Sequence, residues 1–146
     1  MPCETPFDPE DFKIRLSAVV HEEGGEPPQT IIRTDQDWHV HVKWRTTGFL
    51  TGMICGDWHL HVMLESVGRG REYNLFDPAD HYIALTPGPS PVRYRAKIDV
   101  KAGTVHAPKS GMLYRLVVVL TYREPTGDPG PMACYSLEPL ILFYQP

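Results

Sequence analysis

Four histidines form the only concentrated group of chemically active side chains in this sequence. They belong to a six-residue pattern, Asp-Trp-His-x-His-Val, that begins at Asp37 and recurs from Asp57. The four histidines are His39, His41, His59 and His61. Imidazole nitrogen is a common ligand of zinc, nickel and copper, so three or four such side chains can hold one of these ions. A small metal-binding protein is therefore one hypothesis for the chain.

Each copy of the pattern predicts a β-strand with one apolar face. Successive side chains of an extended chain point to opposite faces, and here every second residue is large and apolar. The apolar rows are Trp38, Val40, Val42 and Trp44 in the first copy, and Trp58, Leu60, Val62 and Leu64 in the second. We expect these rows in the core, and the histidines on the opposite face of each strand.

The metal hypothesis depends on how the two copies pair. An antiparallel hairpin centred near residue 51 places His41 opposite His61 and His39 opposite Met63, with directly opposed Cβ atoms about 5 Å apart. Three imidazoles, or imidazoles with Asp57 or Cys55, then converge on one ion.

Plainer interpretations of the histidines carry more weight. The His-x-His spacing is a weak signal without a closed ligand set, and a duplicated strand duplicates its outward residues as well. Surface or interface histidines are thus the favoured reading. A third reading is a pH-sensitive contact, because close imidazoles repel one another once they are protonated near pH 6.

Evidence for catalysis is thin. Cys55, Asp57 and His59 share one strand face, so a thiol–imidazole pair is conceivable. Side chains two apart on a strand diverge, however, and the sequence contains no nucleophile elbow, phosphate-binding loop or dinucleotide motif. A hydrolase is accordingly the third hypothesis, and the sequence favours a protein that is not an enzyme.

The fold class is predicted to be all-β, an antiparallel immunoglobulin-like β-sandwich of about seven strands. The 15 prolines and 12 glycines lie between short alternating apolar runs, and no segment of ten residues keeps a helical apolar period. Gly111, Tyr114 and Leu116 resemble the tyrosine corner of immunoglobulin-like domains, with one extra residue after the glycine. The Cys…Trp…Cys core pattern of that family is absent. We expect an N-terminal arm at residues 1–11 and one domain over residues 12–146.

Charge, cysteine content and hydropathy limit the partners and the location. The net charge of −4 predicts neither a nucleic-acid nor a membrane partner. Three cysteines, an odd and sparse set, argue against a disulfide framework and suit a reducing compartment. The N-terminus lacks the basic and apolar regions of a secretory signal, and the longest apolar run is too short to span a bilayer. A cytoplasmic location is therefore expected.

Two strands near the C-terminus are apolar on both faces, which predicts a covered outer face. They run through residues 116–120 and 140–144. The outward residues proposed as an interface are Val117, Val119, Leu140, Leu142 and Tyr144. Either the arm at 1–11 or the loop at 77–91 covers them, or another chain does, face to face or by adding strands at an edge. We therefore predict a non-enzymatic binding or assembly module without a cofactor. It is expected to self-associate as a homo-oligomer through its doubly apolar strands or its N-terminal arm, or to bind another protein.

Overall fold

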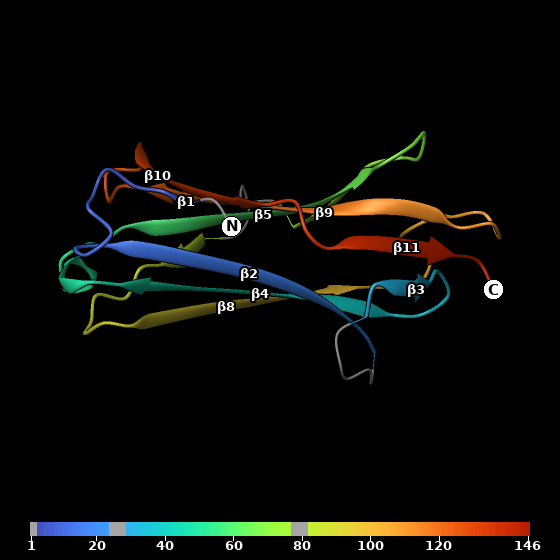
Figure 1. Cartoon of the computed structure of the whole chain (residues 1–146), viewed down its shortest axis with the longest axis horizontal. Helices are drawn as coiled ribbons and strands as arrows, with labels where there is room; N and C mark the ends of the chain where they lie inside the picture. Colours follow the sequence, from blue (N-terminus) through green and yellow to red (C-terminus); the bar gives the residue numbers. More distant parts are fainter. Residues whose placement is uncertain (1–2, 24–28, 77–81) are drawn as a thin grey trace.

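The computed structural model describes residues 3–23, 29–76 and 82–146, and this part of the chain forms eleven strands in two sheets. The smaller sheet is antiparallel, in the order β2-β4-β8. Its strands are β2 (Lys13–Glu22), β4 (Trp38–Thr47) and β8 (Val92–Val100). Figure 1 shows it as the lower of two layers. The predicted all-β class is confirmed.

The larger sheet contains the other eight strands and curls around the opposite side of the core. Its members are β1 (Cys3–Glu4), β3 (Ile31–Arg33), β5 (Asp57–Ser66), β6 (Tyr73–Phe76), β7 (Tyr82–Ala84), β9 (Met112–Arg123), β10 (Pro129–Ser136) and β11 (Leu140–Tyr144). β9 is central: it pairs with β5 along one edge and with β10 and β11 along the other. β3 pairs with β11 in parallel and lies near the level of the smaller sheet in Figure 1.

The core lies between the two sheets and contains both predicted apolar rows. Every residue of the two rows is at most 3% exposed. The Tyr94 ring of β8 contacts the Trp58 ring of β5 across the core, with centroids 6.0 Å apart, and Trp38 of β4 contacts Phe143 of β11 at 5.3 Å. The prediction of these inward faces is confirmed.

The hairpin pairing on which the four-histidine metal site depended does not occur. β4 lies in the smaller sheet between β2 and β8, whereas β5 lies in the larger sheet beside β9. The connection between them contains the short 3-10 helix η1 (Phe49–Gly52), preceded by Gly48 at φ +106° and followed by Gly56 at φ +133°. Glycine adopts such angles readily, so this link can turn away from β4 and cross to the other sheet. The copies face each other through their apolar rows.

The strand count also differs from the prediction. In the described part of the chain, seven strands have five or more residues, and β1, β3, β6 and β7 are shorter additions. The C-terminal segment from Tyr135 to Tyr144 is divided between β10 and β11 around Pro139, which has no N–H to donate to a ladder. β7 lies within the segment 77–91 predicted to be a loop, of which residues 77–81 lie outside the described part.

Tyr114 is fully buried, but it does not form the local corner suggested by the sequence. Its hydroxyl donates a hydrogen bond to the carbonyl oxygen of Arg71 at 2.7 Å. A tyrosine corner bonds to backbone a few residues upstream, whereas Arg71 lies 43 positions away. The tyrosine instead ties β9 to the segment that precedes β6.

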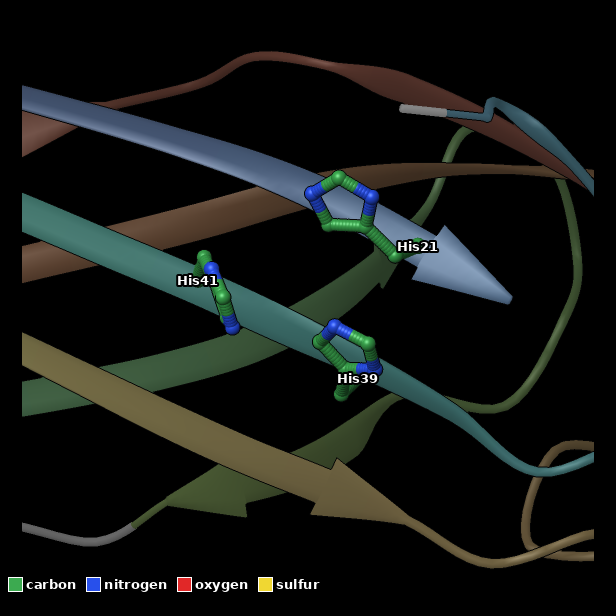
Figure 2. A group of neighbouring side chains, drawn as sticks. All are labelled: His21, His39 and His41. Atoms are coloured by element: carbon green, nitrogen blue, oxygen red, sulfur yellow. The ribbon is translucent and has the colours of Figure 1, made fainter. Parts of the chain in front are cut away.

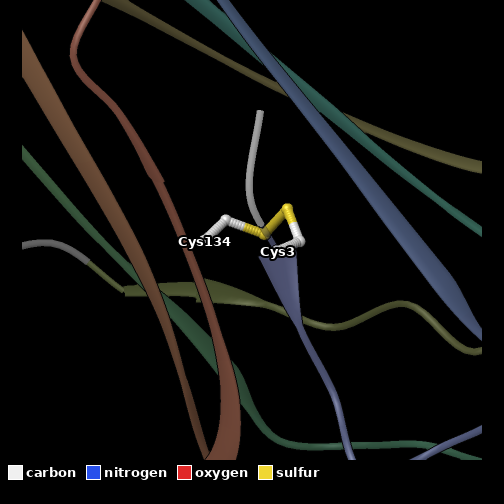
Figure 3. The surroundings of a disulfide bond; sticks show 2 residues. All are labelled: Cys3 and Cys134. Atoms are coloured by element: carbon white, nitrogen blue, oxygen red, sulfur yellow. A yellow bond between two sulfur atoms is a disulfide. The ribbon is translucent and has the colours of Figure 1, made fainter.

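A disulfide joins Cys3 of β1 to Cys134 of β10, two residues that are direct partners in the ladder (Figure 3). The cysteine count argued against such a bond, and that expectation is wrong. An odd count leaves one thiol over, and Cys55 is the free, exposed one. The bond holds the start of the predicted arm, residues 1–11, against the larger sheet of its own chain. Structural disulfides persist mainly in oxidising compartments, so this bond counts against the reasoning behind a cytoplasmic location.

One helical segment, η1, occurs in residues 3–23, 29–76 and 82–146, and no helix there has the length and apolar character needed to cross a bilayer.

A thiol titration tests the disulfide. Unfolded, unreduced protein is expected to show one reactive thiol per chain, and three after reduction, because only Cys55 is free. The matched Cys55→Ser variant is expected to show none before reduction and two afterwards. Three thiols in unreduced wild-type protein would contradict the bond.

Candidate functional site

The structure brings together three histidines, two of which the sequence singled out. His39 and His41 of β4 lie beside His21 of β2 on the outer face of the smaller sheet (Figure 2). One ring nitrogen from each lies within 4.8 Å of one ring nitrogen from each of the others. We call these three residues the histidine triad.

Strand register explains the triad. His21 is the ladder partner of His39, and Val19 is the partner of His41, so His21 and His41 are diagonal neighbours. The His21 ring stacks on the His39 ring with centroids 5.2 Å apart and lies 5.4 Å from the His41 ring. The His39 and His41 rings are 4.8 Å apart. All three side chains are partly buried by one another and by their strands.

Burial and positive neighbours make protonation of His39 and His41 unfavourable. The pKa of His39 is lowered below 6.5, first by burial and then by the charges of His41 and Lys97. The pKa of His41 is lowered for the same first reason, with His21 and Lys43 contributing. Neutral imidazoles are the form that ligates a metal.

Three imidazoles from two strands match the ligand number of an open zinc site, with a fourth position left for water or another ligand. Zinc–nitrogen distances of 2.0–2.1 Å require ligand nitrogens about 3.3 Å apart in a tetrahedron. The nitrogens here lie within 4.8 Å of one another, so binding a zinc ion requires side-chain rotation that brings them closer. Lys97, the ladder partner of His41 on β8, opposes a cation by its charge and forms an ion pair with Asp99 at 3.6 Å.

The other two predicted ligands lie on the far side of the molecule. His59 and His61 are on the outer face of the larger sheet, so the core separates them from His39 and His41. His59 is 7% exposed beneath Tyr82, and its pKa is lowered by burial and then by Arg123. A ring nitrogen of His61 is 2.9 Å from the Asn74 Oδ1 atom. The predicted cluster of four histidines does not form.

The conceivable thiol–imidazole pair gains no support from the surroundings of Cys55. A hollow of about 450 Å³ lies beside Cys55, and its described lining includes Met53, Tyr122 and Met132 but no histidine. His59 contacts Tyr82 instead.

The residues predicted as an interface do share one surface. Val117, Val119, Leu140, Leu142 and Tyr144 all belong to outward rows of β9 and β11 in the larger sheet. Leu140 is 46% exposed, Val119, Leu142 and Tyr144 are partly exposed, and Val117 is nearly buried. Apolar outward neighbours that the prediction did not include are Ile31, Leu113 and Tyr135.

His21 is the functional candidate that the sequence reasoning missed. β2 extends past the apolar residues 18–20 and continues through His21 to Glu22. The outward row of β2 contains Lys13, Arg15, Ser17, Val19 and His21. This alternation is the sequence signal that could have identified His21.

Comparisons with known proteins give no identification. No protein-family model matches the chain, and no curated protein matches it. An X-ray structure of the Northeast Structural Genomics Consortium target SoR45 is 6% identical and aligns over 93% of this chain and 88% of its own, with a TM-score of 0.33. The crystal structure of a Bordetella pertussis protein provisionally named ApaA is 12% identical over 94% of this chain and 97% of its own, with a TM-score of 0.37. TM-scores this low carry no inference about fold or function.

The lowered pKa values of His39 and His41 predict that acid destabilises the protein. The unfolded chain takes up protons at these positions near pH 6.5, whereas the folded chain does so only at lower pH. Their contribution to the free energy of unfolding is therefore complete above pH 6.5 and is lost as the pH falls through the folded-state pKa values.

Urea unfolding at pH 7.5 and pH 5.5 measures this effect. We expect the free energy of unfolding to fall over this interval, and to fall less in a His39→Gln, His41→Gln double variant. His106→Gln, at an exposed histidine away from the triad, is expected to keep the wild-type dependence. An equal slope in the double variant and the wild type would contradict the assignment.

Proposed function

We propose that this protein is a non-enzymatic binding and assembly module that self-associates through the outer face of its larger sheet. The observation that supports this function is the gathering of apolar side chains on that face. Leu113, Leu142 and Ile31 form one row across β9, β11 and β3, in ladder register. Ile31 is 59% exposed and Leu113 is 38% exposed. Contiguous exposed apolar surface of this kind is typical of protein contact sites.

The charges on the outer face of the larger sheet favour a second copy of the chain as its binding partner. Glu65 of β5 and Arg115 of β9 are ladder partners on this face, and no ion pair joins them among the described residues. In a contact with two-fold symmetry, each Glu65 faces the Arg115 of the other copy, with the apolar row alongside. The smaller sheet is unsuited to such pairing, because its outer face carries Arg15, Lys43 and Arg95, which repel their own copies.

The immunoglobulin-like topology of this module stays a prediction. Two facing sheets with a shared core are compatible with it. The support for this topology is the division of the longer strands, with three in the smaller sheet and four in the larger.

Sedimentation equilibrium at micromolar concentration tests the assembly. Wild-type protein is expected at twice the 16.5 kDa chain mass or a higher multiple. An Ile31→Lys, Leu140→Lys double variant is expected to be monomeric, because it places charges within the proposed contact. Met53→Lys is the matched control, since Met53 is equally apolar and 71% exposed but lies beside η1. A monomeric wild type would overturn the proposal.

The second candidate function is metal binding by the histidine triad. The supporting observation is the convergence of three ring nitrogens within 4.8 Å. Zinc, nickel and copper are the ions that suit three imidazoles. His21 replaces His59 and His61 in the ligand set that the sequence suggested.

Zinc, nickel or copper binding is tested by calorimetry and thermal unfolding. We expect one ion per chain, and at a hundredfold excess over Kd a rise in Tm of about 5–10 °C. His21→Ala and His39→Ala are expected to abolish the rise. A His59→Ala, His61→Ala variant is the control and is expected to keep the binding stoichiometry. Equal loss in both sets of variants, or no binding by the wild type, would remove this candidate.

A further inference from the structure

The outer face of the smaller sheet is strongly basic although the chain as a whole is acidic. Seven cations of the outward rows belong to β2, β4 and β8: Lys13, Arg15, Lys43, Arg45, Arg93, Arg95 and Lys97. Asp99 is the one carboxylate in these rows, so the face has a formal charge of +6. The remaining seven Lys and Arg and 17 Asp and Glu give the rest of the chain −10. The total of −4 conceals this separation.

A hollow of about 680 Å³ opens in the middle of this basic face. Its lining is a block of three consecutive residues from each strand, 15–17, 43–45 and 93–95, all in ladder register. Each rung of this block consists of one residue from each strand. In the central rung Leu16 and Trp44 point into the core, so the backbone forms the floor of the hollow. The rungs on either side point outward and are exposed. We call this the basic hollow.

Among the residues that the structure describes, five cations and no carboxylate line the basic hollow. One rung consists of Arg15, Arg45 and Arg93, and the other contains Lys43 and Arg95 beside Ser17. Neighbouring strands are about 4.8 Å apart and successive outward residues about 6.8 Å apart, so these groups are close. Among the described residues, none of the five forms an ion pair. Like charges placed opposite each other destabilise a sheet.

We propose that the basic hollow binds a compact anion that carries several phosphate groups. Arginine presents a planar fork of donors that matches phosphate oxygens, and four of the five cations are arginines. The volume lies within the usual range of small-molecule sites. An anion with several charges contacts both rungs at once and removes the repulsion between them.

The basic hollow suits a phosphate chain better than single-stranded nucleic acid. Proteins that bind single strands stack bases on exposed aromatic rings. The aromatic residues of the lining are Trp44, which is 2% exposed, and Tyr94, which packs parallel to it with centroids 5.6 Å apart. Both therefore serve the core. This site lies on the opposite side of the molecule from the proposed assembly face, so the two proposals stand or fall separately.

Calorimetric titration with inorganic triphosphate tests the proposal. Wild-type protein is expected to bind one triphosphate per chain, with affinity that falls as KCl is raised and with much weaker binding of orthophosphate. An Arg45→Gln, Arg95→Gln variant is expected to bind at least tenfold more weakly. An Arg69→Gln, Lys109→Gln variant removes the same charge from exposed turns elsewhere and is expected to stay within twofold of the wild type.

Two further measurements separate specific recognition from general attraction. Without ligand, the Arg45→Gln, Arg95→Gln variant is expected to have an unchanged or higher Tm, because substitution relieves repulsion. ATP is expected to bind with the affinity of triphosphate. No triphosphate binding, equal weakening in the control variant, or ATP binding more than tenfold tighter would overturn the proposal. Binding of a DNA duplex that triphosphate does not displace would overturn it as well.

Discussion

The structure depends on the burial of two matching apolar rows between facing sheets. Trp38 to Trp44 in β4 and Trp58 to Leu64 in β5 supply four large side chains each, and each row is almost completely excluded from water. Burial of one such side chain contributes about 1.5–3 kcal/mol. A strand shifted by one residue would expose its whole row, so the core determines which face of each strand points outward.

The two outward faces that result have different chemistry. The larger sheet presents apolar side chains around β9 and β11, whereas the smaller sheet presents cations and the histidine triad. Because most carboxylates lie elsewhere in the chain, the basic face is locally uncompensated. The triad lies at one end of that face, where burial and nearby positive groups lower the pKa of His39 and His41 and so favour the neutral imidazoles. The same positive charges that favour the neutral imidazole also repel a metal cation. Metal affinity at the triad therefore depends both on the protonation state of the imidazoles and on the local electrostatic potential.

Much of the fold was predictable because alternation is a local property. The long strands and their inward rows follow from a period of two, as at β8, where the exposed Arg93, Arg95 and Lys97 alternate with more buried residues. Continuing the same count along β2 to His21 would have completed the triad. The disulfide was harder to predict from the sequence, because Cys3 and Cys134 are 131 positions apart and only the pairing of β1 with β10 brings them together. Net charge concealed the basic face for a related reason, since it sums over faces that never meet.

By itself, the sequence determined which residues of each strand share a face, because side-chain direction in an extended chain depends only on position. The tertiary structure decided which strands are neighbours. The repeated pattern suggested a hairpin with four histidines on one surface, but apolar rows gain more by facing each other across a core than by lying side by side. The copies therefore occupy opposite sheets. This arrangement places His39 and His41 beside His21, and it places His59 and His61 on the opposite face of the molecule.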